Sequence, residues 1–189
     1  MSHIRTFVAV DISDEARGRV RDLVEELKQY KADVRWVAPE SLHLTLKFLG
    51  EIDEGRLEDV FSGVEEAVSG VEPFRMVLEG LGGFPGLGRP RVLWVGVSDG
   101  AEELRNLAAR VEGSLEHRGF PREDRPFSPH LTIGRVKRLS GRLRQLTDAM
   151  RGGGFGPEEV RVEEVKVMKS DLRPSGAVYT TLRSFPLRG

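Results

Sequence analysis

Short apolar runs along the first half of the chain alternate with segments in which apolar residues recur every three or four positions. Periods near two favour strands, and periods near 3.6 favour amphipathic helices. The strands predicted in this half cover residues 5–10, 35–37, 42–49 and 74–81. One helix is predicted from Ser13 or Asp14, either of which can cap it, to about Lys31, and a second over residues 54–69.

The same order of elements starts again after a Gly/Pro-rich segment at residues 82–90, which we interpret as a connector. The pattern predicts strands over residues 92–97, 131–136, 160–168 and 178–182. It predicts helices over residues 101–117 and 139–150, with a loop at 152–156. A last turn is expected at residues 174–176.

An internal match fixes the register of this repetition. Pro39-Glu40-Ser41-Leu42-His43-Leu44-Thr45-Leu46 shares Pro, Ser, His, Leu and Thr with Pro126-Phe127-Ser128-Pro129-His130-Leu131-Thr132-Ile133. The offset of 87 from His43 to His130 also aligns Phe7 with Trp94 and Phe74 with Arg161. We therefore predict one domain of two similar lobes, each a βαβαβ unit, with repeats at about 1–83 and 91–189 joined by the connector 82–90.

Composition narrows the classes of protein that fit. The chain has 189 residues, of which 39% are hydrophobic, and it has no Cys. Disulfides, thiolate zinc sites, iron–sulfur clusters and thiol nucleophiles are therefore excluded. Since the sequence shows neither a signal peptide nor an apolar run of membrane-spanning length, we expect a cytoplasmic protein with no membrane partner.

The formal net charge of -1 conceals an uneven distribution. Residues 10–72 carry 8 basic and 16 acidic side chains, whereas residues 118–151 carry 9 basic and 3 acidic ones. A locally basic segment can meet phosphates even in a neutral protein, although a solvated charged surface accounts for the same composition. The basic side chains that could follow an RNA backbone are Arg122, Arg125, Lys137, Arg138, Arg142 and Arg144.

The two matching segments each combine an imidazole and a hydroxyl on one face of a predicted strand. A period of two places His43 with Thr45, and His130 with Thr132, while the aliphatic neighbours take the other face. If the lobes pack about a pseudo-twofold axis, the pairs meet across a groove. One imidazole can then accept a proton while the other donates one, and the hydroxyls can bind phosphoryl oxygens. The alternative is a duplicated structural strand that has kept its histidine.

These motifs carry a resemblance to a known family. His43-Leu44-Thr45-Leu46 and His130-Leu131-Thr132-Ile133 resemble the paired His-x-Thr-x motifs of the two-histidine (2H) phosphoesterase superfamily. The chain is most similar to the RNA 2′,3′-cyclic phosphodiesterase branch, also called 2′-5′ RNA ligase-like. Segments 5–10, 91–94 and 170–180 are similar to that branch as well.

The resemblance implies an α+β, bilobal, pseudo-twofold fold with antiparallel sheets lining a central cleft. It also implies metal-independent opening of RNA 2′,3′-cyclic phosphate ends to 2′-phosphates, with weak, reversible, ATP-independent 2′-5′ ligation. In the matching positions His43 would be the proton donor and His130 the proton acceptor. Thr45 and Thr132 would bind phosphate.

Further candidates are less directly tied to the motifs. Arg135 could meet phosphate, but simple alternation places it opposite His130, so a bulge or strand end is required. Tyr179, Phe48 and Trp94 could stack on bases, although for Phe48 and Trp94 we favour the core.

Other sites and functions are weaker alternatives. There is no Walker A sequence, and the glycines at 82–88 precede a strand, so they form no dinucleotide loop. We predict no cofactor and no metal, because neither motif brings an acidic ligand or a third His. His3 and His117 are expected at the surface of what we take to be a monomer. Hydrolysis of small cyclic nucleotides, such as ADP-ribose 1″,2″-cyclic phosphate, or binding of RNA ends without turnover remain open.

Overall fold

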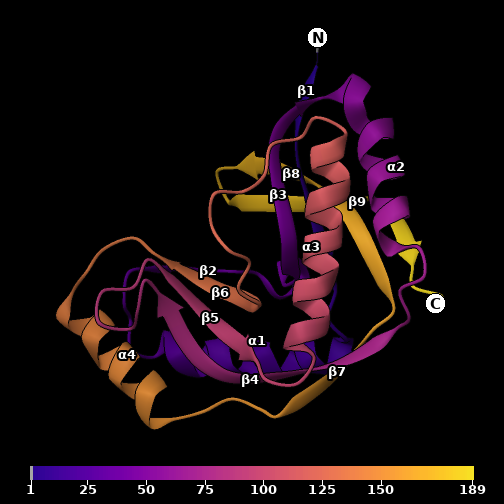
Figure 1. The fold of residues 1–189 in the computed structure, drawn as a ribbon. Coiled ribbons are helices and arrows are strands. Elements are labelled where there is room, and N and C mark those ends of the chain that lie inside the picture. The colour runs from indigo at the N-terminus through magenta and orange to yellow at the C-terminus, as the bar shows by residue number, and fades with distance from the viewer. Residues whose placement is uncertain (1) are drawn as a thin grey trace.

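The computed structural model describes residues 2–189, which form two antiparallel sheets flanked by helices (Figure 1). The strands are β1 (His3–Val10), β2 (Val34–Trp36), β3 (Leu44–Asp53), β4 (Phe74–Phe84), β5 (Val92–Val97), β6 (His130–Val136), β7 (Glu158–Val162), β8 (Glu164–Arg173) and β9 (Gly176–Pro186). Sheet A has the order β3-β1-β8-β9, and sheet B has the order β2-β6-β5-β4-β7. The α+β class with antiparallel sheets is confirmed.

The four α-helices cover the two sheets in pairs. They are α1 (Asp14–Lys28), α2 (Leu57–Val68), α3 (Ala101–His117) and α4 (Gly141–Gly152). Helices α2 and α3 pack together against sheet A, while α1 and α4 lie along sheet B (Figure 1). No helix within residues 2–189 is long and apolar enough to cross a membrane.

Local signals placed the helix starts well. The side chain of Ser13 accepts a hydrogen bond from the Ala16 N–H and so caps α1 as predicted. The helix ends at Lys28, three residues earlier than expected. The helix predicted from residue 54 begins with a 3-10 turn, Glu54–Arg56, before α2 starts at Leu57.

The predicted connector at 82–90 is not a joint between two lobes. Residues 82–84 continue β4, which forms a hairpin with β5 inside sheet B. Gly82 is required there because the ring of Trp94 occupies the space of a Cβ, and a Cβ on Gly83 would lie 3.1 Å from Pro90 Cβ. These glycines therefore permit close packing between strands rather than forming a linker.

The repeats exchange strands instead of folding separately. At an offset of 87, β4 corresponds to most of β8, yet β4 pairs with β5 in sheet B and β8 pairs with β1 in sheet A. Each sheet therefore combines strands from both halves of the chain. This arrangement ties the halves into one unit.

The last strands differ from the predicted bounds. The single strand expected at 160–168 is two strands, β7 in sheet B and β8 in sheet A, separated at Glu163. The strand expected at 178–182 extends over all of β9, because β8 pairs with it along a long hairpin. The chain passes from sheet B to sheet A at Glu163, and no Gly or Pro marks this position. The hydrophobic pattern therefore gave no sign that the predicted strand is interrupted there.

Candidate active site

His43 is fixed in orientation by the turn that precedes it. A 3-10 turn, Pro39–Ser41, leads into His43, and β3 begins at the next residue. The His43 Nδ1 lies 2.7 Å from the Ser41 carbonyl oxygen. Since a carbonyl only accepts hydrogen bonds, Nδ1 carries the proton, and Nε2 is the nitrogen left for other partners.

His130 repeats this arrangement in the other sheet. It is the first residue of β6, and its Nδ1 lies 2.7 Å from the Ser128 carbonyl oxygen. The shared Pro-x-Ser-x-His pattern therefore gives both imidazoles the same tautomer, with Nε2 available. The repeated serine was visible in the sequence, but the role of its backbone carbonyl was not.

Burial changes the proton affinity of both rings in the same direction. Desolvation is the main cause that lowers the pKa of His43, partly opposed by the Ser41 hydrogen bond and the charge of Asp11. Desolvation likewise lowers the pKa of His130, opposed by its Ser128 hydrogen bond. Both imidazoles are therefore held closer to the neutral form than an exposed histidine.

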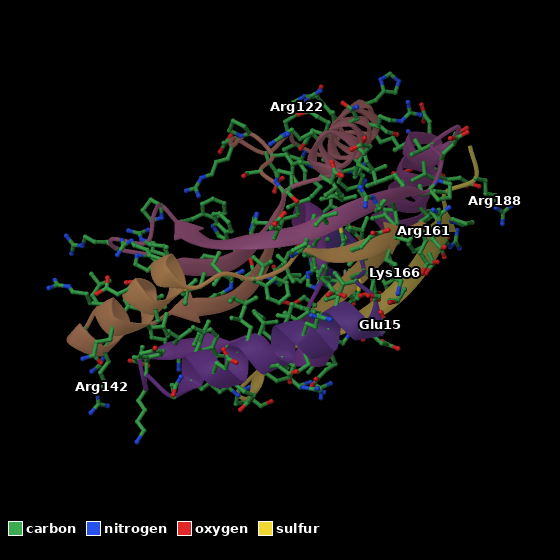
Figure 2. The ribbon with its side chains drawn as sticks, turned by 90° about the horizontal axis from the view of Figure 1, so that it is seen from below. Glu15, Arg122, Arg142, Arg161, Lys166 and Arg188 are labelled. Atoms are coloured by element: carbon green, nitrogen blue, oxygen red, sulfur yellow. The ribbon has the colours of Figure 1, made fainter. Side chains whose placement is uncertain are left out.

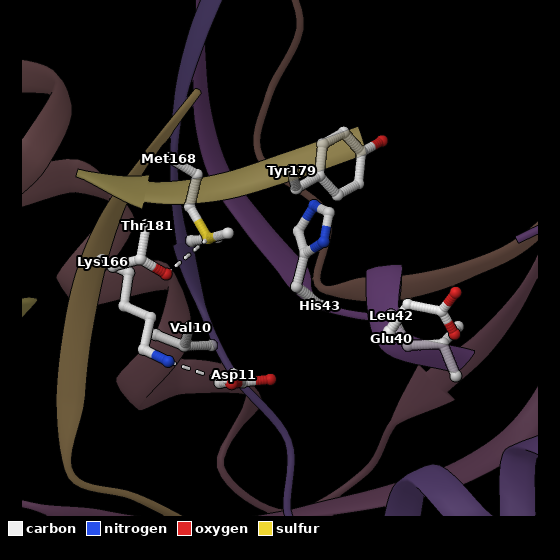
Figure 3. A pocket seen from close by; sticks show the side chains of 10 residues that line it. Val10, Asp11, Glu40, Leu42, His43, Lys166, Met168, Tyr179 and Thr181 are labelled. Carbon is white, nitrogen blue, oxygen red and sulfur yellow. Dashed lines mark hydrogen bonds and ion pairs between the residues drawn. The ribbon is translucent and has the colours of Figure 1, made fainter. Parts of the chain in front are cut away.

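Aromatic side chains fix each imidazole from the side. Phe7 stacks on His43 with ring centroids 4.7 Å apart. Tyr179 meets the same ring edge-on at 4.9 Å, and Figure 3 shows Tyr179 beside His43. Phe84 meets His130 edge-on at 4.8 Å. Packing of this kind limits rotation of the rings and so preorganises the two Nε2 atoms.

A polar pocket adjoins His43, as Figure 3 shows. Asp11 and Lys166 line it and form an ion pair at 3.1 Å, and Arg17 binds the other Asp11 oxygen at 2.6 Å. Burial raises the pKa of Asp11, but the Ile12 N–H and these cations outweigh it, so the pKa lies below its usual value. The pocket beside His43 thus holds fixed charges, a feature that the sequence analysis missed.

Each threonine lies two residues after its histidine, and each is followed by a bulge. On β6, Thr132 pairs with Trp94 and Gly134 with Leu93, so Ile133 is the extra residue. On β3, Thr45 pairs with Ala9 and Lys47 with Val8, so Leu46 is extra. Leu46 and Ile133 correspond at the offset of 87, and the duplicated strands therefore share one irregularity.

The bulge on β6 turns Arg135 to the side of the catalytic candidates. A Cβ on Gly134 would point at Val34 and Trp36, on the side away from the exposed Arg135. The charge of Arg135 also lowers the pKa of His130, which shows that the two groups lie near each other. Simple alternation would have placed Arg135 on the face opposite His130, and this bulge reverses that placement.

The other two aromatic candidates both differ from the prediction that they lie in the core. Phe48 is 55% exposed, because the bulge at Leu46 turns it outward. Trp94 is half-buried and outside the hydrophobic core; it pairs with Thr132, so it lies on the same face as that threonine, and it packs against Phe84 at 5.4 Å between ring centroids.

The basic segment at 118–151 does not form one continuous surface. Arg122 follows α3, whereas Arg142 lies on α4 at the other end of the molecule (Figure 2). Arg122 also pairs with Glu116 at 2.5 Å. Charge that is continuous in sequence is thus divided between distant parts of the fold.

Strands β3 and β6 approach each other although they belong to different sheets. The strands that carry Thr45 and Thr132 are therefore in contact with each other. His3 and His117 are exposed, as predicted. Among residues 2–189, no group of three or more His, Asp or Glu side chains is placed to hold a metal ion.

Comparison with known proteins identifies one family, and its model covers each of the two His-x-Thr segments once. The family model described as LigT like Phosphoesterase matches the chain twice, over residues 10–94 and 95–179. An Archaeoglobus fulgidus protein named RNA 2′,3′-cyclic phosphodiesterase is 41% identical over 96% of this chain and 99% of its own length. A Thermotoga maritima protein of the same name is 34% identical over 98% of this chain and 97% of its own.

Solved structures agree on the fold. A crystal structure of a Thermus thermophilus protein has a TM-score of 0.85 at 32% identity, covering 98% of this chain and 99% of that one. The E. coli LigT structure complexed with 3′-AMP has a TM-score of 0.80 at 24% identity, covering 100% of both chains. The second likeness supports the fold alone.

Proposed function

The chain belongs to the LigT-like phosphoesterase family of the two-histidine superfamily, and from this premise we propose that it converts RNA 2′,3′-cyclic phosphate ends to 2′-phosphates without a metal. Curated relatives across nearly its whole length are cyclic phosphodiesterases by name, which supports the reaction class. The observation that carries the proposal is the matched pair of imidazoles, each with Nδ1 bound to a serine carbonyl and Nε2 available.

The proposed reaction moves one proton in and one proton out. The Nε2 of neutral His130 accepts a proton from water as the water oxygen attacks phosphorus. The bond from phosphorus to the ribose 3′-oxygen breaks, and protonated His43 donates its Nε2 proton to that oxygen. The product keeps the phosphate on the 2′-oxygen, and the two histidines exchange protonation states before the next turnover.

Which histidine takes which role follows from the family resemblance, and the environment of His43 is compatible with the role of acid. Asp11, held ionised by Lys166 and Arg17, partly opposes the burial that lowers the pKa of His43, whereas Arg135 adds to the lowering of the pKa of His130. The nearby carboxylate favours an imidazolium at His43. The nearby guanidinium favours a neutral base at His130.

Hydroxyl and aromatic groups complete the proposed site. Thr45 on β3 and Thr132 on β6 each lie two residues after a histidine and would donate hydrogen bonds to the non-bridging phosphate oxygens as negative charge grows there. Tyr179 packs on His43 and would border the sugar or base. Arg135 would bind phosphate from the β6 side.

The same pair of histidines could open the ring with a different nucleophile. A ribose 5′-hydroxyl in place of water would attack the cyclic phosphate and give a 2′-5′ linkage. This ligation needs no ATP, because the strained cyclic phosphate supplies the driving force. We propose it as a weaker second activity.

Product analysis on a defined RNA tests the proposal. Wild-type protein treated with EDTA is incubated with an oligonucleotide ending in a 2′,3′-cyclic phosphate, and the ends are separated from 2′- and 3′-phosphate standards. The expected product is the 2′-phosphate, with the rate unchanged by EDTA. A 3′-phosphate product, loss of activity in EDTA, or binding without turnover would each contradict the proposal.

A further inference from the structure

A pair of arginines lies directly opposite each other at the edge of sheet B. Strand β2 is the edge strand, and its register against β6 pairs Arg35 with Arg135. Residues directly opposite in an antiparallel pair lie on the same face of the sheet. Both side chains are exposed.

The face that carries this pair is the face of the catalytic candidates. The neighbours of Arg35 on β2, Val34 and Trp36, point to the opposite face, where they pack against the core and fill the space beside Gly134. Because the bulge at Ile133 places Arg135 on the side of Thr132, Arg35 lies on that side too, one strand further out.

The pair lacks a counter-ion within the part of the chain that the structure describes. Across residues 2–189, neither Arg35 nor Arg135 forms an ion pair with a carboxylate, whereas the nearby Arg138 pairs with Asp33 at 3.8 Å. Like charges directly opposite each other destabilise a sheet. Two unpaired guanidinium groups in this position are therefore stabilised when an anion binds between them.

We propose that Arg35, together with Arg135, binds the internucleotide phosphate next to the cyclic end, so that the enzyme acts preferentially on oligonucleotides rather than on cyclic mononucleotides. The inference rests on the proposed function and extends it to the length of the substrate. The cyclic phosphate occupies the groups at His43 and His130. The next phosphodiester along the chain is the anion that reaches the edge of sheet B.

The test compares substrates that differ only in this phosphate. kcat/KM is measured for a cyclic mononucleotide and for a dinucleotide with the same cyclic end, using wild type and Arg35→Gln. We expect Arg35→Gln to lower kcat/KM for the dinucleotide roughly tenfold, the effect of one charge-assisted hydrogen bond, and to leave the mononucleotide unchanged. The salt dependence for the dinucleotide should also weaken by about one phosphate contact.

The matched control is Arg188→Gln, since Arg188 is an exposed arginine that follows β9 and should leave both substrates unaffected (Figure 2). Equal losses on both substrates, or no change in their ratio, would overturn the proposal. A binding assay with a dinucleotide ending in a 2′-phosphate distinguishes failure of the phosphate site from failure of the proposed function. If wild type turns over neither substrate, the proposed function fails. A loss of salt-sensitive binding in Arg35→Gln would still support the phosphate site, and unchanged binding would refute it.

Discussion

The two halves of the site share their first residues and differ just beyond them. From the residue before β3 onward the order is His43, Thr45, a bulge at Leu46, then Lys47 and Phe48. On β6 it is His130, Thr132, a bulge at Ile133, then Gly134 and Arg135. The shared part would supply the two acid–base groups of the proposed mechanism, and the divergent part places an exposed aromatic ring beyond one bulge and an exposed guanidinium beyond the other.

The two strands also differ in the contacts that hold them in place. Lys47 is 1% exposed and binds the Glu112 carboxylate at 2.5 Å and the Pro121 carbonyl at 2.9 Å, which ties β3 to α3 and the loop after it. Gly134 instead leaves room for Val34 and Trp36 on β2. One half is thus anchored by a buried ion pair and the other by close packing on a glycine.

Removing either histidine should have the largest effect, because both proton transfers are needed. We expect His43→Ala and His130→Ala each to lower kcat on cyclic-phosphate RNA about 10²- to 10⁴-fold. The double variant should be little worse than either single one, since the pair acts as a unit. His117→Ala, an exposed histidine on α3, is the control. Full activity in either single variant would refute the acid–base role proposed for that histidine.

Breaking the anchor of β3 should cost stability. Glu112→Gln leaves the Lys47 ammonium buried without its carboxylate, and we expect a loss of about 3 kcal/mol in the free energy of unfolding, measured by urea denaturation. Glu116→Gln, which breaks the exposed pair with Arg122, should cost less than about 1 kcal/mol. Equal costs would show that Lys47 anchors nothing.

The pH dependence should reflect burial of both rings. Activity falls at high pH when the acid, His43, loses its proton, and at low pH when the base, His130, gains one. Burial lowers both pKa values below the ordinary 6.5, so we expect kcat/KM to peak below pH 6.5 and to fall about tenfold per unit on the alkaline side. The apparent values belong to the pair. A rate that stays constant up to pH 8 would contradict this account.

Removing the exposed ring of Phe48 should have the smallest effect. If a base stacks on the exposed Phe48, Phe48→Ala should weaken oligonucleotide binding about fivefold, at the low end for stacking on one base. Titration of a 2′-phosphate oligonucleotide measures it. Leu139→Ala removes another exposed apolar side chain, 51% exposed, and should change nothing. Equal affinities in the two variants would exclude stacking on Phe48.

The sequence was sufficient to locate the candidate site because the motif is local and duplicated. The offset of 87 located both histidines and both threonines, and the structure gives the two imidazoles the same hydrogen bond. Helix starts such as Ser13 were predictable because a cap is a local interaction. The exposure of Phe48 was not, because simple alternation fails at a bulge that is defined only by the partner strand.

The exchange of β4 and β8 between the sheets also could not be predicted from the hydrophobic pattern of the sequence. Strand pairing is a non-local choice, and each of these strands has the same alternation whichever neighbour it joins. The glycines at 82 and 83 suggested a linker by composition, yet they are explained by the Trp94 ring and by the close approach of Pro90. Composition could not separate flexibility from close packing.

If the two equivalent histidines perform opposite proton transfers, a change of leaving group should separate their roles. An aryl phosphodiester that releases nitrophenolate needs no proton at the leaving oxygen, but its water nucleophile still needs a base. On this substrate we predict that His43→Ala retains most of the wild-type kcat/KM while His130→Ala remains inactive. Equal losses in both variants, or the reverse order, would contradict the assignment.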